Sequence, residues 1–138
     1  AFVGLPHEAS GYFHRIIVAQ DYSAVTAACV LVKRKAFEEV GGFDEGYAVA
    51  FNDVDLCLKI REAGYLVVYN PYAELMHYES KSRGYEDTAE KVERFNSEIK
   101  LFQKKWKHFL EKGDPYYNPN LTLDKQDFSL SVIPRTKK

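Results

Sequence analysis

The stretch from Asn52 to Gly64, NDVDLCLKIREAG, constrains the fold of this chain more than any other. Asn52 can cap a helix and Gly64 can end one in a left-handed conformation, so we expect a helix running to about Ala63. Apolar side chains fall on two adjacent faces of this helix: Val54, Cys57 and Leu58 with Arg61 on one, and Leu56, Ile60 and Ala63 on the other. So wide an apolar stripe predicts a helix packed between a sheet and a second element.

Short strand patterns flank this helix on both sides. The segment Ala24–Lys33 is apolar on both alternations and rich in β-branched residues, which is typical of a strand covered on both faces. Further strands are predicted at Arg15–Ala19, Tyr65–Tyr69 and Ala73–His77, with a turn at Asn70-Pro71 between the last two. The sequence therefore predicts an α/β fold with a small mixed sheet of three or four strands.

Two more helices are expected. A short one over Lys35–Val40 is stopped by Gly41 and Gly42, and the glycine-rich stretch after it, GGFDEGYAVAF, reads as an ordered loop. A long one runs to about Leu110, and Asp87 with Glu90 predicts a capping box at its start. Its apolar residues repeat at three- and four-residue steps: Val92, Phe95, Ile99, Phe102, Trp106 and Phe109. We expect this stripe to dock on its own domain, with a partner helix as the alternative, and an extended arm after Gly113.

Composition excludes several classes of protein. The 138 residues suit one domain, with 46% apolar residues, 28% charged residues and a net charge of −1, so no basic excess indicates nucleic acid. Cys29 and Cys57 both lie in apolar stretches, which favours two buried reduced thiols over a disulfide or a zinc site. No apolar run is long enough to span a membrane, and a cytoplasmic protein is the default. The ten tyrosines suit either a small core and its rim or a surface for sugars or proteins.

The pair Asp53 and Asp55 admits three interpretations: a shared metal site, a proton acceptor, or the start of a helix. Residues two apart on a helix point roughly 200° apart around its axis, so the two carboxylates cannot face one cation. Asp55 stands three residues after the predicted cap, where a carboxylate can bond back to the cap backbone and favour the helix dipole. Asp53 lies directly behind the glycine-rich loop, free to point into a cleft. Catalysis and a second dipole-favouring acid both remain open for Asp53.

His77 ends a predicted strand whose alternation places it on one face with Ala73 and Leu75. A lone histidine there is most often a satisfied core or rim residue. The polar loop that follows, with Ser82 and Arg83, favours instead a neutral imidazole beside a metal-bridged phosphate group.

The run from Val25 to Gly84 resembles the C-terminal half of the catalytic domain in glycosyltransferase family 2. The resemblance lies in the order and spacing of its parts: VTAACVLVK, then a short helix and GGFDE, then NDVDL opening a helix, then AGY and a strand ending in His77. The tail YYNPNLTLD is similar to the ending of bacterial members that build rhamnose-containing surface polysaccharides. The resemblance implies a partial GT-A-type fold. It assigns residues 1–113 to the acceptor-side half of the catalytic domain and residues 114–138 to the arm.

The resemblance also implies an activity and roles for particular residues. The parent enzyme would transfer a sugar, with inversion, from a nucleotide-diphosphate donor to a saccharide or lipid-linked acceptor in cell-surface polysaccharide synthesis. Asp53 matches the family's catalytic base, and His77 matches a ligand of a divalent metal, Mg²⁺ or Mn²⁺. Ser82 and Arg83 match the loop that closes over the donor diphosphate. The residues matching the acceptor side are Phe43, Asp44, Glu45 and Asn52. The parent would work in the cytoplasm, peripherally at the inner face of the membrane.

This sequence departs from the family at several points. Asn52 replaces a glutamate, and Ala27 replaces a glycine, which narrows the space beside that segment. The residues ahead of Val25 are too few for the nucleotide-binding half, so we expect an enzyme fragment with no transferase activity alone. A fragment of this kind exposes strand edges and apolar surface, so self-association is expected. The alternative is a non-catalytic protein- or carbohydrate-binding interaction domain.

Overall fold

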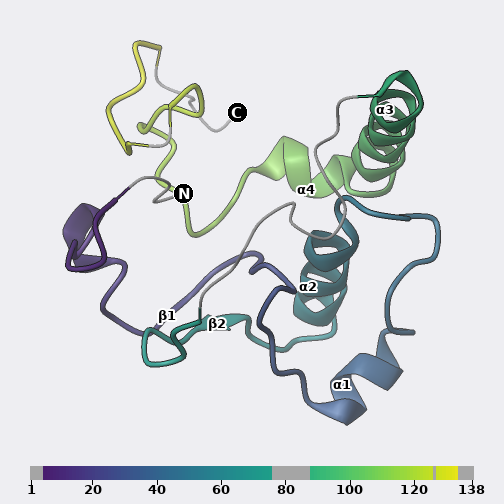
Figure 1. Cartoon of the computed structure of the whole chain (residues 1–138), viewed down its shortest axis with the longest axis horizontal. Coiled ribbons are helices and arrows are strands. Elements are labelled where there is room, and N and C mark those ends of the chain that lie inside the picture. Colours follow the sequence, from purple (N-terminus) through teal and green to yellow (C-terminus); the bar gives the residue numbers. More distant parts are fainter. Residues whose placement is uncertain (1–4, 76–87, 126, 134–138) are drawn as a thin grey trace.

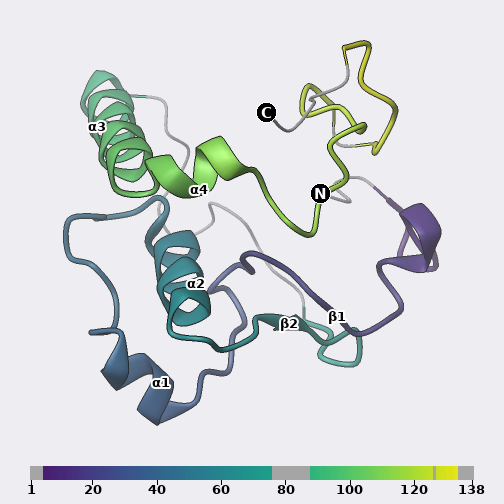
Figure 2. The same ribbon diagram turned by 180° about the vertical axis from the view of Figure 1, so that it is seen from behind.

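The computed structural model describes residues 5–75, 88–125 and 127–133. Its centre is the helix α2 (Asn52–Glu62), and the other elements are arranged around it (Figure 1). They include the short 3-10 helix η1 (Tyr12–His14) and α1 (Arg34–Glu39) ahead of α2, and α3 (Ala89–Lys105) and α4 (Lys107–Lys112) after it. Seen from behind, the first described residues and residues 114–125 and 127–133 of the C-terminal segment occupy the same side of the molecule, opposite α1 (Figure 2).

The sheet is smaller than the sequence predicts. In the described residues it consists of β1 (Gln20–Asp21) and β2 (Val68–Tyr69), which pair antiparallel with Gln20 opposite Tyr69. The prediction of a strand over Ala24–Lys33 is wrong, because residues 24–33 form loop and turn ahead of α1. The predicted strand at Arg15–Ala19 is likewise wrong in position, since pairing begins only at Gln20.

The two remaining strand predictions fare differently. Only the end of the predicted strand Tyr65–Tyr69 is paired, as β2, and residues 73–75 form no strand. Those residues follow the turn expected at Asn70-Pro71, where the amide of Ala73 donates to the carbonyl of Asn70 at 3.3 Å. The fold is therefore mixed α/β, as predicted, but with less strand than a covered mixed sheet needs.

Both predicted helix stops are confirmed. Gly41 and Gly42 follow α1 with φ of 74° and 64°, a left-handed backbone that favours glycine. At the end of α2, the amide of Gly64 donates to the carbonyl of Arg61 at 2.9 Å, and that of Tyr65 donates to Ile60 at 3.2 Å. This pair of bonds is a Schellman motif, with Gly64 at φ 87°.

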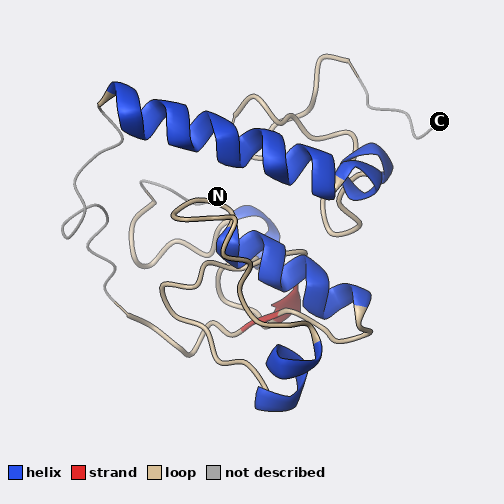
Figure 3. Ribbon diagram, turned by 90° about the vertical axis from the view of Figure 1, so that its right-hand side faces the viewer, coloured by secondary structure: helices blue, strands red, loops and turns tan. Residues whose placement is uncertain are grey.

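The prediction that α2 packs between a sheet and a second element is confirmed only in part, because loop residues and α1, rather than a sheet, cover its second side. Figure 3 shows α3 lying over one side of α2, with α1 on the other. Leu58 packs toward α3 in a cluster with Tyr47, Phe102 and Trp106. Three α2 residues form a second cluster with Val67: Leu56, Cys57 and Ile60. Cys57 therefore lies on the same face of α2 as Leu56 and Ile60, and not on the face of Leu58 as predicted. The long helix α3 packs on α2, whereas the sequence predicted that it would pack across the sheet.

The long helix differs from prediction at its start, its end and along its stripe. Its cap is the Thr88 hydroxyl, which accepts the amide of Lys91 at 3.3 Å, and the predicted partner Asp87 lies outside the described residues. The helix breaks at Trp106, whose φ and ψ are −103° and 22°, so α4 is a separate turn of helix. In the stripe, Phe102 and Trp106 are buried, but Val92 and Phe95 are exposed.

The C-terminal segment contains no helix among its described residues, as expected, but it folds back on itself. Leu121 and Leu130 form an antiparallel bridge, and the Tyr117 hydroxyl donates to the carbonyl of Thr122 at 2.6 Å. Leu121 is buried, so this segment is folded rather than fully extended.

Candidate functional site

Asp53 lies in the first turn of α2 and is half-buried. Its Oδ1 accepts the amide of Val54 at 2.8 Å, and its Oδ2 accepts the amide of Ala27 at 3.2 Å. The second bond comes from the loop that precedes α1, far from α2 in sequence. The carboxylate is thus oriented by one donor on its own helix and one across the fold.

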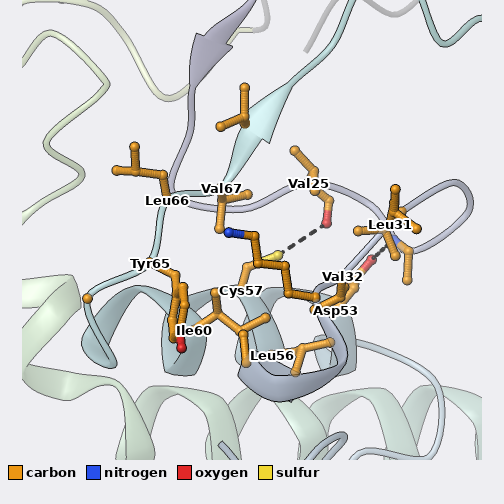
Figure 4. Close-up of a pocket in the computed structure, with 16 residues that line it drawn as sticks. Val25, Leu31, Val32, Asp53, Leu56, Cys57, Ile60, Tyr65, Leu66 and Val67 are labelled. Atoms are coloured by element: carbon orange, nitrogen blue, oxygen red, sulfur yellow. Dashed lines mark hydrogen bonds between the residues drawn. The ribbon is translucent and has the colours of Figure 1, made fainter. Parts of the chain in front are cut away.

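Asp53 also lines a pocket of about 500 Å³ (Figure 4). The pocket floor consists of α2 side chains and the residue before β2, namely Leu56, Cys57, Ile60 and Val67. Apolar residues of the loop before α1 form another wall, with Val25, Leu31 and Val32 labelled in the figure. Within this mostly apolar lining, Asp53 supplies a carboxylate that is held in place and reaches the space.

Cys57 also lines the pocket, and its environment makes it a poor nucleophile. Burial raises the pKa of its thiol, and the nearby charge of Asp53 acts in the same direction. The thiol donates to the carbonyl of Val25 at 3.7 Å (Figure 4). Cys57 is free and buried, as predicted, whereas Cys29 is free but exposed, so its predicted burial is wrong.

Asp55 points away from the pocket and belongs to the scaffold, as the helix geometry predicts. It has no exposed surface, and its Oδ1 accepts the indole N–H of Trp106 at 2.8 Å and lies 2.7 Å from the Lys105 ammonium. Its Oδ2 has no hydrogen-bond donor among the described residues but lies 3.7 Å from the Lys59 ammonium. The predicted bond from Asp55 back to the cap is absent here, because Lys105 at the end of α3 and the adjacent Trp106 are the partners of its Oδ1.

The start of α2 is built differently from the predicted cap. Phe51, not Asn52, occupies the cap position, with a left-handed φ of 64° that is uncommon for a residue with a side chain. Asn52 is the first helical residue, and its Oδ1 accepts the amide of Asp53 at 2.7 Å. The Asn52 side chain therefore contacts the backbone amide of the candidate base and not its carboxylate.

None of the four candidates for the acceptor side, Asn52 included, lines the Asp53 pocket. Asp44 is 2.7 Å from the Lys105 ammonium and accepts the amide of Gly46 at 2.9 Å. The hydrogen bond from Lys105, followed by that from Gly46, lowers the pKa of Asp44 below its ordinary value. Phe43 is half-exposed and packs edge-on against Phe37, and Glu45 is exposed.

His77, Ser82 and Arg83 lie outside the described residues. The described residues contain no group of three or more histidine, cysteine, aspartate or glutamate side chains that could hold a metal ion. The part of the chain that the structure describes therefore does not by itself provide the donor set for a divalent cation.

Sequence reasoning missed Glu98, a residue of α3. Its side chain is almost fully buried and accepts three consecutive backbone amides from the loop before α2. A signal was available, because Glu98 falls three residues after Phe95 and four before Phe102, within the apolar stripe. A carboxylate at such a position needs partners, and only the fold shows that they are backbone amides.

Comparison with known proteins supplies relatives for this chain. The chain is 54% identical over 127 residues to an uncharacterized protein of Sinorhizobium fredii, covering 91% of this chain and 14% of the relative. It is 38% identical over 116 residues to an O-antigen biosynthesis protein of Myxococcus xanthus, covering 83% of this chain and 9% of the relative. No family model matches the chain, and no solved structure matches it either.

A third relative carries a named activity. Over 60 residues, 44% of this chain and 20% of the relative, the chain is 47% identical to an N-acetylglucosaminyl-diphospho-decaprenol L-rhamnosyltransferase of Mycobacterium tuberculosis. The chain is thus homologous to segments of bacterial sugar transferases and polysaccharide-synthesis proteins. Rhamnosyltransferases are among these homologues, which confirms the resemblance drawn from the sequence. The chain spans less than a quarter of the length of each of these relatives.

Within the described residues, no helix combines the length and the apolar character needed to cross a membrane.

Proposed function

We propose that this chain forms the acceptor side of an inverting glycosyltransferase of family 2, with Asp53 as general base. In the step assigned to it, Asp53 takes the proton of an acceptor hydroxyl group. At the same time the oxygen of that hydroxyl group attacks the anomeric carbon of the donor sugar. The bond from the anomeric carbon to the diphosphate breaks at the same time, and the nucleotide diphosphate leaves with the electron pair. The product has the opposite anomeric configuration to the donor.

The observation that carries this proposal is the placement of Asp53. Its carboxylate is oriented by two backbone amides, borders a pocket of about 500 Å³, and has no cation within 4 Å among the described residues. The neighbouring Asp55 shows the contrast, because it is fully buried and held by Lys105 and Trp106. Of the two carboxylates, only Asp53 can meet a hydroxyl group brought into the pocket.

The names of the relatives support a choice of substrates. We infer that the donor is a nucleotide-diphospho-rhamnose and the acceptor a saccharide linked through diphosphate to a lipid. The name of the mycobacterial relative gives the rhamnosyl group and an acceptor of this kind. The largely apolar pocket lining suits the apolar face of a sugar ring or the start of a lipid chain. Such an acceptor would bring the protein to the cytoplasmic face of the membrane as a peripheral protein.

The donor and metal roles are proposed for His77, Ser82 and Arg83, in the segment after β2. A divalent ion, Mg²⁺ or Mn²⁺, would stabilise the charge of the departing diphosphate. The described residues form no metal site of this kind. The proton transfer proposed above therefore involves only Asp53 and the acceptor hydroxyl group.

The test is rhamnosyl transfer by a full-length transferase that carries this segment. We expect Asp53→Asn to lower kcat by about 10²- to 10⁴-fold, the usual contribution of a general base. Glu111→Gln, an exposed carboxylate on α4, is the matched control and should leave kcat unchanged. If the Asp53→Asn variant had the same kcat as the wild type, the assignment of Asp53 as the base would be refuted.

The 138-residue chain is tested separately. We expect no transfer from the isolated chain with any nucleotide-sugar, because the proposal assigns it only the acceptor side. Turnover by the isolated chain that disappears in Asp53→Asn would show that it binds donor as well. We further propose that the isolated chain self-associates through the exposed apolar rim of the Asp53 pocket.

A further inference from the structure

The carboxylate of Glu98, on α3, binds the loop that leads into α2 through hydrogen bonds. Its Oε1 accepts the amides of Ala48 at 2.9 Å and Val49 at 3.1 Å, and its Oε2 accepts the amide of Ala50 at 2.8 Å. The residue is 3% exposed. Because burying an unpaired carboxylate is strongly unfavourable, three amide donors on one carboxylate define the position of both partners.

The charge of Glu98 has a cationic neighbour on the same helix. The guanidinium of Arg94, one turn earlier, lies 4.0 Å from Oε1. The loop amides are therefore not the sole compensation for the negative charge of Glu98, because Arg94 also contributes. Its distinctive contribution is directional, since each amide it accepts fixes the orientation of one peptide unit of the loop.

The peptides bound by Glu98 connect directly to the start of α2. Phe51 follows Ala50 in a left-handed conformation, and its ring stacks on Phe102 at 5.0 Å and on Phe95 at 5.9 Å between centroids. The carbonyl of Phe51 accepts the amide of Asp55 at 2.8 Å, the bond that opens α2. Helix α3 thus holds both the amides and the ring of the segment immediately before Asp53.

We propose that Glu98 is a positioning residue for Asp53, acting through residues 48–51. The strained Phe51 conformation persists only if its surroundings define it, and α3 supplies these surroundings. With the loop held, the first turn of α2 directs the Asp53 carboxylate to the amide of Ala27 and to the pocket. This inference rests on the proposed role of Asp53 as the base, and it adds a residue of α3 that touches neither substrate nor pocket.

The test compares Glu98→Gln with Glu93→Gln, an exposed carboxylate on the same helix. In Glu98→Gln, an amide nitrogen replaces one acceptor oxygen, so at least one loop amide loses its partner. In the isolated chain we expect amide hydrogen exchange at residues 48–50 to accelerate about tenfold or more. We also expect the amide resonances of Ala27 and Val54, which donate to Asp53, to shift, with no shift in Glu93→Gln.

A kinetic measurement separates positioning from general support of the fold. In a full-length transferase that carries this segment, Glu98→Gln should lower kcat up to about 100-fold with the KM for the donor unchanged. Glu98→Asp, which keeps the charge but shortens the side chain, should restore part of kcat and serves as the second variant if Glu98→Gln does not fold.

Two outcomes would overturn the inference. One is faster exchange at residues 48–50 with unchanged resonances of Ala27 and Val54, because the effect of Glu98 would then not reach Asp53. The other is a parallel loss of kcat in Glu93→Gln. If Asp53→Asn keeps full activity while Glu98→Gln shifts Ala27 and Val54, the base assignment fails and the positioning contact stands.

Discussion

At the scale of single residues, two aspartates two positions apart occupy opposite environments, one lining a pocket and the other fully buried. Asp53 faces a pocket, and its carboxylate accepts only backbone amides among the described residues, whereas Asp55 is enclosed by Lys105 at the end of α3 and by Trp106, which follows it. Their divergence follows from helical geometry and could be predicted from the sequence. The partners of Asp55 could not, since they arrive from fifty residues further along the chain.

Asp55 should be among the most costly residues to replace. Removing one member of a buried charge pair leaves the other uncompensated, so we expect Asp55→Ala to lower the free energy of unfolding by about 3–5 kcal/mol. Asp53→Asn should change it by less than about 1 kcal/mol, because the carboxylate is half-buried and has no ion pair among the described residues. Urea denaturation of both variants would show the difference, and equal losses would contradict the assignment of Asp55 to the scaffold.

Asp44 gives the molecule a pH dependence. The Lys105 hydrogen bond holds the pKa of Asp44 below its ordinary value of 3.8, so its contribution to stability is present above that value and is lost as the pH falls through the lower, folded-state pKa. For Lys105, burial lowers the pKa, but hydrogen bonds to Asp44 and Asp55 outweigh it and the net shift is upward. We expect Asp44→Asn to destabilise the chain at pH 7, and the difference from the wild type to shrink as the pH falls below 3.8. A stability difference that does not shrink over this range would count against this pairing.

At the scale of elements, α3 does more than the apolar stripe predicted. The sequence indicated a helix docking through one face, and Phe102 and Trp106 confirm this for the second half of the stripe. The first half, with Val92 and Phe95, remains exposed in the described structure. The predicted strand at residues 24–33 fails for a related reason, since an apolar run marks burial but does not distinguish a strand from a loop folded over a helix.

The two phenylalanines of α3 offer a matched test of this division. Phe102 is buried against α2, so Phe102→Ala should lower the free energy of unfolding by about 3–5 kcal/mol. Phe95 is exposed and contacts mainly the ring of Phe51, so Phe95→Ala should cost about 1 kcal/mol. Thermal or urea unfolding would measure both. A loss in Phe95→Ala as large as in Phe102→Ala would mean that the whole stripe is docked.

At the scale of the whole molecule, apolar surface gathers around the Asp53 pocket. Leu31 is fully exposed, and Leu66 and Val68 are more than half exposed, all three on the pocket lining. β1 and β2 pair only with each other among the described residues, which leaves both with an open edge. The resemblance to half of a catalytic domain predicted exposed strand edges, but the sequence did not indicate that the apolar rim would surround the candidate base.

This rim predicts a concentration-dependent association. We expect sedimentation velocity to show dimers or larger species of the isolated chain at high concentration, and Leu31→Lys with Leu66→Lys to shift the chain toward monomer. Leu123→Lys is the control, an equally exposed leucine away from the pocket. A monomeric wild-type chain at millimolar concentration would contradict the association, and an equal effect of Leu123→Lys would place it elsewhere.

The contacts between the earliest and latest described segments carry a consequence for biosynthesis. Ser23 donates to Asp114 at 2.7 Å, Arg15 donates to the carbonyl of Tyr116, and the rings of Tyr12 and Phe128 stack at 5.0 Å. On a ribosome adding about 5–20 residues per second, the first of these groups would wait roughly 5–20 s for their partners to emerge. Until then Tyr12 and Arg15 have only local partners such as Phe13 and Tyr22, so a nascent chain stalled before residue 114 would leave this aromatic surface open to chaperones.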